Sequence, residues 1–383
     1  MADVFHRPEL AHELATRLVD PPPASAVGSG LFLAAPRRTG KSTFLVADLL
    51  PALENAGART VYVDLWRDIE RDAAETIVAA VGAALASERG AASRAARALA
   101  GIESVSAGGV FSVSLRGPDG NVGHVSLTDA LLALSDELGR TIVLVIDEAQ
   151  HAITTGTGAR ALFALKAARD ALNIDRPHGL RIVATGSNRD KLSMLRSSKD
   201  QAFFGAPLMA FPPLGRDYVA WFVERRGLGD ALGVDETTRW FERAGHRPEI
   251  LSAAADAVLW ELGGERGTLA TRLEAAMEAE VRGADEAQLR VVRSLTPLQS
   301  AVLREMARSG AGYAPFERET MGRYAATLAE LAPESSLVPG DANVQSALGS
   351  LQRRELVWRA ARGVYALEDA RLVGLMRVEG MLD

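Results

Sequence analysis

A lysine and two hydroxyl residues follow a glycine near the start of the chain, in the run Ala35-Pro36-Arg37-Arg38-Thr39-Gly40-Lys41-Ser42-Thr43. The run matches the phosphate-binding pattern G-x-x-x-x-G-K-[ST] except at its first position, where Ala35 replaces glycine. In such loops, backbone N–H groups surround the phosphates, the lysine neutralises their charge and the hydroxyl ligates magnesium. We predict that this segment binds a nucleotide, with Lys41 on the β- and γ-phosphates and Ser42 on the metal. The replacement by Ala35 is compatible with this role if its φ is negative. A strand–turn–helix with a surface lysine is the alternative.

An acidic pair, Asp147-Glu148, directly follows the apolar run Thr141–Ile146. A continuous apolar run is typical of a strand that is buried on both faces of a parallel sheet. Ligands of such sheets bind at the carboxyl ends of the strands. We predict that Asp147 holds the magnesium shell and that Glu148 orients and polarises the attacking water. An ordinary acidic turn is the alternative.

Polar residues also follow a second apolar run, Leu180–Ala184. Thr185, Ser187 and Asn188 come directly after it, at a position where a polar group would reach a γ-phosphate or the attacking water. The same residues are equally typical of a polar turn at a strand end.

The elements that would hold these residues alternate along the first half of the chain. Apolar runs predict strands at residues 31–34, 60–65, 141–146, 180–184 and 208–211. Helices are expected at residues 1–20, 42–50, 73–100, 127–138 and 159–172, with a strand or hairpin at residues 104–113 and a turn at residues 117–120. Strands that alternate with helices indicate an α/β fold with a parallel sheet.

The character of the sequence changes after Pro212-Pro213. Residues 216–284 have a helical pattern, and Thr296-Pro297 opens a further region. We therefore predict three domains: a P-loop ATPase α/β core at residues 1–214, a helical lid at residues 215–290 and a winged helix-turn-helix at residues 296–383.

The last region resembles a winged helix-turn-helix in its order of elements. Helices are expected at residues 297–308, 316–328 and 343–355, followed by strands at residues 356–359 and 364–367. A local basic cluster would grip DNA phosphates, and it consists of Arg353, Arg354, Arg359 and Arg362. Asn343 or Gln345 would then touch base edges. The alternative is a solvated arginine face on a domain that contacts proteins.

The composition excludes several classes of site. The chain has 383 residues, a net charge of −6 and no cysteine, so disulfides, thiolate zinc sites and cysteine nucleophiles are excluded. The six histidines show no metal-ligand spacing, and no global basic field exists to drive nucleic-acid binding. No apolar run approaches the ~18 residues that a membrane span needs. We expect no signal peptide, no membrane contact and a cytoplasmic location.

Taken together, the motifs resemble the archaeal-type ATPases, which are AAA+-related P-loop ATPases close to the origin-recognition and STAND groups. The resemblance rests on PRRTGKS, VYVDL, VIDEAQ and ATGS, in that order. It implies that Val4-Phe5-His6-Arg7 borders the adenine pocket and that Ser187 or Asn188 senses the γ-phosphate. It also implies that Arg247, in the segment Gly245–Pro248, touches the γ-phosphate; the alternative is an arginine at a helix N-terminus.

One departure from the family affects the expected mechanism. Many relatives place an arginine just before the last strand, where it meets a neighbouring subunit's nucleotide. The corresponding stretch here, residues 202–207, has no arginine, so Arg196 or Lys199 would have to substitute.

Three functions remain open from the sequence. The first is a magnesium-dependent ATPase that couples its nucleotide state to DNA or to a protein through the winged helix. The second is a STAND-like signalling switch with slow turnover and no DNA binding. The third is a winged-helix regulator with a relic P-loop, against which the intact Gly40-Lys41-Ser42 and Asp147-Glu148 count. No guanine-specific NKxD motif is visible, and the sequence leaves the partner and the oligomeric state, including a homo-oligomer, undecided.

Overall fold

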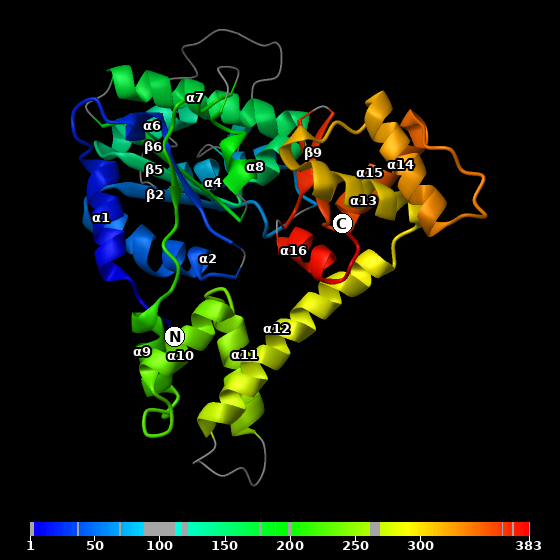
Figure 1. Cartoon of the computed structure of the whole chain (residues 1–383). Coiled ribbons are helices and arrows are strands. Elements are labelled where there is room, and N and C mark those ends of the chain that lie inside the picture. The colour runs from blue at the N-terminus through cyan, green and yellow to red at the C-terminus, as the bar shows by residue number, and fades with distance from the viewer. Residues whose placement is uncertain are drawn as a thin grey trace. The chain divides into compact units, whose positions relative to one another are not determined.

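The structure is a computed structural model of the whole chain, drawn in Figure 1. It describes residues 4–36, 38–68, 70–87, 112–116, 122–175, 178–187, 189–197, 201–260, 269–361, 363–369 and 371–382. Of the predicted site residues, Arg37, Asn188, Lys199 and Arg362 lie outside these ranges. The chain forms two compact units, Met1–Trp221 and Phe222–Asp383.

A parallel sheet of five strands forms the centre of the first unit. Its strands are β1 (Leu31–Ala34), β2 (Arg59–Asp64), β5 (Ile142–Asp147), β6 (Leu180–Gly186) and β7 (Leu208–Ala210). Their order across the sheet is β2-β5-β6-β1-β7, and each neighbouring pair is parallel. The predicted parallel α/β fold is therefore confirmed. Since Ala34 pairs with Gly186 and Asp64 with Asp147, the polar segments that follow these strands emerge at one edge.

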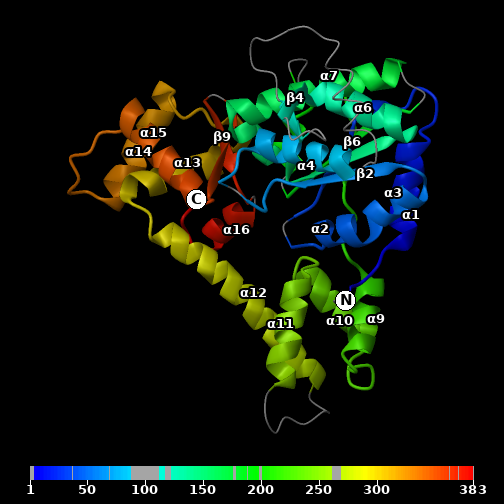
Figure 2. The same cartoon turned by 180° about the vertical axis from the view of Figure 1, so that it is seen from behind.

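Helices cover both faces of this sheet (Figures 1 and 2). On one face α1 (Pro8–Val19) and the helix after the phosphate loop pack against alternate strand residues such as Leu33 and Val145. On the other face lie α4 (Ala73–Ser87), α6 (Leu127–Leu138) and α7 (Gly156–Asp175), with α8 (Arg189–Ser193) beside them. Strand β5 is buried along its whole length, as its unbroken apolar run predicts.

The helix after the phosphate loop differs from its prediction. We expected residues 42–50, but the helix begins as α2 (Lys41–Phe44), passes through a π-helical turn at Leu45–Leu49 and continues as α3 (Leu50–Asn55). Pro51 lies at the start of α3 and has no N–H for the regular i→i−4 bond, which is compatible with the local widening. The π turn contains Asp48, whose side chain is buried although the residue type is usually exposed.

A β-hairpin lies between α4 and α6 and continues beyond the predicted limit at residue 113. We predicted a strand or hairpin at residues 104–113; the described part of this region is β3 (Ser112–Arg116), which pairs antiparallel with β4 (Val122–Ser126). Residues 104–111 and the predicted turn at residues 117–120 lie outside the described ranges, as does the predicted helical stretch beyond Ser87.

Helices make up the first part of the second unit. Helix α9 (Arg216–Arg225) leads into it, and α10 (Val234–Arg243), α11 (Pro248–Leu259) and α12 (Leu269–Arg293) follow. Helix α12 runs on to Arg293, beyond the predicted helical limit near residue 284.

The last part of the second unit has the element order of a winged helix-turn-helix. Helices α13 (Pro297–Ser309), α14 (Arg318–Leu331) and α15 (Asp341–Arg353) precede an antiparallel pair, β8 (Val357–Ala361) and β9 (Val364–Leu367), and α16 (Arg371–Val378) follows. These elements share one core, which includes Tyr324, Leu348 and Met376. The division of this unit into a lid and a winged-helix domain at the predicted limits stays a prediction.

Candidate nucleotide-binding site

The phosphate loop connects β1 to α2 at the carboxyl edge of the sheet. Arg38 and Gly40 both have a positive φ, at 62° and 82°, and Gly40 directly precedes the first residue of α2. Only glycine adopts this conformation without strain, which explains Gly40. Ala35 is not among the described residues with positive φ, so alanine fits where the pattern has glycine. The Thr39 hydroxyl donates to the carbonyl of Pro36 at 2.8 Å and holds the loop closed.

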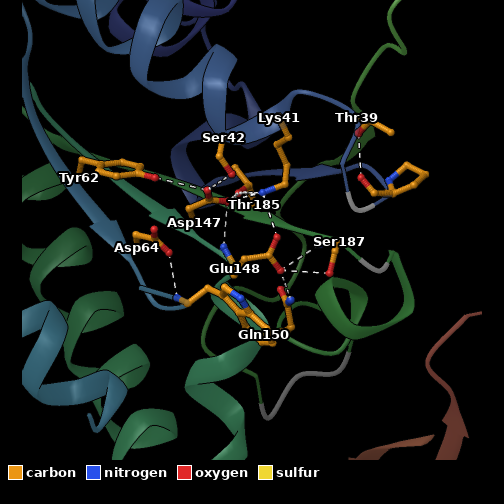
Figure 3. A network of polar contacts seen from close by, with 12 residues as sticks. Thr39, Lys41, Ser42, Tyr62, Asp64, Asp147, Glu148, Gln150, Thr185 and Ser187 are labelled. Carbon is orange, nitrogen blue, oxygen red and sulfur yellow. Dashed lines mark hydrogen bonds and ion pairs between the residues drawn. The ribbon is translucent and has the colours of Figure 1, made fainter. Parts of the chain in front are cut away.

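Lys41 and the acidic pair meet at this edge, as Figure 3 shows. The Lys41 ammonium forms a buried ion pair with Asp147 and lies 3.2 Å from Oε1 of Glu148. It also donates to the Thr185 hydroxyl at 3.0 Å. The lysine is 4 % exposed, so this is no surface lysine. Three segments far apart in the sequence therefore converge on one buried charge cluster.

Asp147 accepts hydrogen bonds from several sides. The Ser42 hydroxyl donates to Oδ2 at 2.6 Å, Tyr62 approaches the same oxygen at 3.4 Å, and Thr185 and the Glu148 amide donate to Oδ1. Burial opposes ionisation of this carboxyl, but Lys41 and the hydroxyl donors outweigh it and hold the pKa of Asp147 below its usual value. Burial and the nearby carboxylates raise the pKa of Tyr62, which therefore stays protonated.

The donor set fits magnesium. Oxygen ligands from a hydroxyl and a carboxylate suit this ion, which in nucleotide sites uses one or two protein oxygens together with phosphates and waters. Ser42 Oγ and Asp147 Oδ2 lie 2.6 Å apart, close enough to serve one metal shell. Among the described residues there is no cluster of three or more His, Cys, Asp or Glu side chains able to hold a metal alone.

Glu148 accepts hydrogen bonds from Ser187, which the sequence predicted as a site residue, and from Gln150, which it did not. Its φ is 53°, a left-handed conformation that is uncommon outside glycine. Its Oε2 accepts from the Ser187 amide at 3.3 Å, from the Ser187 hydroxyl at 3.1 Å and from Nε2 of Gln150 at 2.5 Å. Gln150 was missed; its only sequence signal is its place in VIDEAQ, two residues after Glu148.

The N-terminal segment is attached to the helix after the phosphate loop. Both oxygens of Asp48 bind it: Oδ1 lies 2.6 Å from Nδ1 of His6, and Oδ2 accepts from the Arg7 amide at 3.0 Å. Arg7 also donates to the carbonyl of Pro212 at 2.7 Å and lies over the Phe211 ring. This arrangement joins Val4–Arg7 to the phosphate-loop helix through Asp48, a residue the sequence did not single out.

Other predicted residues have partners that bear on their expected roles. Arg196 donates to the carbonyl of Ala206, so acting on a neighbouring subunit would require it to leave this bond. Arg247 lies in the second unit just before α11 and pairs with Glu249 at 2.8 Å, so its contact with a phosphate stays a prediction. Thr43, in the first turn of α2, is exposed.

The predicted base-contacting residues of the winged helix bond to neighbouring residues, and their contact with DNA bases stays a prediction. We expected Asn343 or Gln345 to read bases, but the Asn343 side chain accepts from the Gly340 amide and donates to the Val338 carbonyl, at 2.8 and 2.9 Å. It thus caps α15, and base contact would require it to leave this cap. Gln345 bonds to the Tyr365 hydroxyl at 3.1 Å and joins α15 to β9.

The described arginines of the predicted basic cluster are all exposed. Arg353 and Arg354 at the end of α15 are exposed, and Arg354 donates to Ser294 at 2.9 Å. Arg359 in β8 is exposed and lies over the Tyr365 ring.

The segment that contains this site is similar to a known protein family. Residues 28–193 match the family described as AAA domain. They contain the phosphate loop, the acidic pair and Ser187. The predicted resemblance to AAA+-related P-loop proteins is thereby confirmed. No curated protein sequence matches the chain.

Solved structures extend the likeness of the AAA domain to the rest of the chain. The ORC2 protein of Aeropyrum pernix in its ADP form is similar over 100 % of this chain and 96 % of that one, with a TM-score of 0.50 and 15 % identity. The same protein in ADPNP–ADP complexes gives 0.49 and 16 % over 97 % and 93 % of the two chains. The ORC1 protein of that organism in complex with DNA gives 0.38 and 16 % over 99 % and 95 %. At 15 % identity, the similarity to the ORC2 protein in its ADP form shows a shared fold.

None of the helices in the described ranges combines the length and the apolar character that a membrane span requires.

Proposed function

We propose that the chain binds ATP with magnesium and hydrolyses it, and that its nucleotide state is passed to a DNA or protein partner through the winged helix. The observation that carries this proposal is the convergence of Lys41, Ser42, Asp147 and Glu148 at one sheet edge inside an AAA domain. The ORC2 protein that shares the fold was solved in its ADP form, which supports a nucleotide as the ligand.

Each residue has a distinct part in this mechanism. Lys41, now paired with Asp147 and Glu148, would turn to the β- and γ-phosphates when these arrive. Ser42 and Asp147 would hold magnesium, which neutralises charge on the phosphate oxygens. Glu148, freed from Lys41, would orient the attacking water. Asp147 stays ionised because of its hydroxyl donors as well as Lys41, so it is ready to hold the metal.

The direct test is release of inorganic phosphate from ATP by the full chain. We expect turnover in excess magnesium and none after the metal is removed with EDTA, because the phosphate charge is then left without its cation. Restoring magnesium should restore turnover. Absence of phosphate release at all magnesium concentrations would reject hydrolysis and favour a relic P-loop.

A STAND-like switch with slow turnover is the second candidate. The bond from Arg196 to the Ala206 carbonyl favours it, because it occupies an arginine that would otherwise be available to a neighbouring subunit. The mass of the protein in solution, measured with and without ATP, shows whether the chain assembles, which separates the candidates further. Turnover that rises with protein concentration as the chain assembles would contradict the slow switch.

DNA binding is tested through the two exposed arginines at the end of α15. Each neutralised phosphate contributes about 0.9 to the slope of log affinity against log salt. Replacing Arg353 and Arg354 together with alanine is expected to lower that slope by up to ~2 while leaving ATP affinity unchanged. The measurement is fluorescence anisotropy of a labelled duplex across a salt series.

A control for this pair exists on the first unit. Arg17 and Arg71 are exposed, and each pairs with a glutamate four residues away in the sequence. Replacing both with alanine removes the same charge as replacing Arg353 and Arg354. We expect the slope of this control to equal that of the wild type. No DNA binding by the wild type at low salt, with or without ATP, would reject the DNA partner and leave a protein partner.

A further inference from the structure

The two oxygens of Glu148 have different surroundings, and the difference is informative. Oε2 accepts three hydrogen bonds, two from Ser187 and one from Gln150. Among the described residues, Oε1 lies 3.2 Å from the Lys41 ammonium. If Lys41 turns to a phosphate, Oε1 would lose that contact, whereas the three donors to Oε2 do not involve Lys41. Figure 3 shows Gln150 and Ser187 both directed at the Glu148 carboxylate.

Gln150 donates to Glu148 from a buried position in which its own side-chain oxygen has no hydrogen-bond partner among the described residues. The residue is 3 % exposed. A buried acceptor without a partner is destabilising. If the side-chain amide of Gln150 were flipped, its oxygen would face the Glu148 carboxylate, and two acceptors would repel each other. The NH2 group therefore faces Glu148. A group that only filled space at this position would not need a polar end.

Gly186 makes room for this glutamine. A Cβ on Gly186 would lie 2.2 Å from Oε1 of Gln150, which is closer than real side chains approach. The φ of Gly186 is not in the left-handed region, so the backbone conformation alone does not require glycine. The absence of a side chain in β6 therefore admits the carboxamide beside Glu148.

We propose that Gln150, seated against Gly186, is a positioning residue that fixes the rotamer of Glu148 through Oε2 and so leaves Oε1 as the oxygen that accepts the proton of the attacking water. This inference rests on the proposed ATP hydrolysis. Ser187 acts on the same oxygen, so Gln150 and Ser187 together form a clamp on one side of the carboxylate. Gln150 would act only through its hydrogen bond to Glu148.

The test uses Gln150→Leu in the full chain, because leucine has nearly the same size and no donor. We expect kcat to fall between about 10-fold and 100-fold, the range that a misplaced catalytic group produces, with the Kd for ATP unchanged. The urea midpoint of unfolding should stay equal or rise, because an unpaired buried acceptor is removed. A purely structural glutamine would instead lower the midpoint. The matched control is Gln288→Leu in α12, with wild-type kcat.

Gly186→Ala provides an independent variant. Its new methyl group would displace the Gln150 carboxamide, so kcat should fall to a similar degree. In the double variant, Gly186→Ala with Gln150→Leu, the second replacement should add little, because both remove the same contact. The proposal would be overturned if the fold-decrease in kcat of the double variant equalled the product of the two single decreases. A wild-type kcat in Gln150→Leu would overturn it as well.

The failure of this inference can be told from failure of the proposed function. If Glu148→Gln stops turnover while Gln150→Leu keeps the wild-type kcat, only the positioning role is wrong. If the wild type releases no phosphate in magnesium, the proposed hydrolysis is wrong, and the inference fails with it.

Discussion

Replacing Lys41 with alanine is expected to abolish tight ATP binding, because the γ-phosphate loses the point charge that neutralises it. The measurement is titration calorimetry with ATP at constant magnesium. Lys166→Ala is the matched control, since this lysine lies in α7, away from the phosphate loop. It should bind ATP as the wild type does. Unchanged affinity in Lys41→Ala would show that the phosphates bind elsewhere.

The same replacement should also destabilise the protein without nucleotide. Lys41 is buried with Asp147, and removal of one partner from a buried ion pair typically costs about 3–5 kcal/mol, because the other charge is left uncompensated. Asp147 keeps hydrogen bonds from Ser42 and Thr185, which limits the loss to the lower part of that range. Urea unfolding at pH 7 measures it.

The loss should depend on pH in a defined direction. In the wild type the pKa of Asp147 is lowered, so its stabilising contribution is present above the unfolded value of about 3.9 and disappears as pH falls through the folded value. In Lys41→Ala the burial remains without the cation, so the pKa of Asp147 should rise. The difference in unfolding free energy between the two proteins should therefore shrink from pH 7 towards pH 4. An equal difference at both pH values would contradict this electrostatic account.

The sheet and the phosphate loop were predictable because their signals are local. Unbroken apolar runs such as that of β5 identify buried strands, and a parallel sheet then brings the segments after those strands to one edge. The sequence therefore predicted that the acidic pair lies at the carboxyl edge of the sheet, where the ligand of such a sheet binds.

The contacts that the sequence did not predict are long-range and conformational. Asp48 is buried because a π turn presents it to His6 and Arg7, and the sequence has no pattern for such a turn. Gln150 is a polar residue in a short 3₁₀ segment, where helical or strand periodicity says nothing about burial. The cap made by Asn343 was also not predicted: we expected its helix to begin at this residue, but the helix begins at Asp341, so Asn343 lies in the first turn and its side chain accepts from the Gly340 amide.

Replacing Glu148 with glutamine is expected to slow ATP hydrolysis by about 100-fold or more, since a positioned general base typically contributes that much. Glutamine has the same shape and no negative charge, so Asp147, Ser42 and Lys41 can still serve the metal and the phosphates. The Kd for ATP should therefore stay close to that of the wild type. Single-turnover phosphate release measures the chemical step separately from product release.

The consequence of this variant is an ATP-bound state that persists, which makes it a tool as well as a test. After mixing with ATP and magnesium and rapid gel filtration, the nucleotide retained on Glu148→Gln should be ATP, whereas the wild type should retain ADP. Glu13→Gln is the control: it removes one carboxylate from an exposed pair with Arg17 in α1, where the loss is about 0.3–0.5 kcal/mol, and it should hydrolyse ATP normally. Wild-type turnover in Glu148→Gln would mean that another group orients the water. The clamp formed by Gln150 and Ser187 would then hold a carboxylate with no part in the reaction, and both the mechanism and the inference built on it would be wrong.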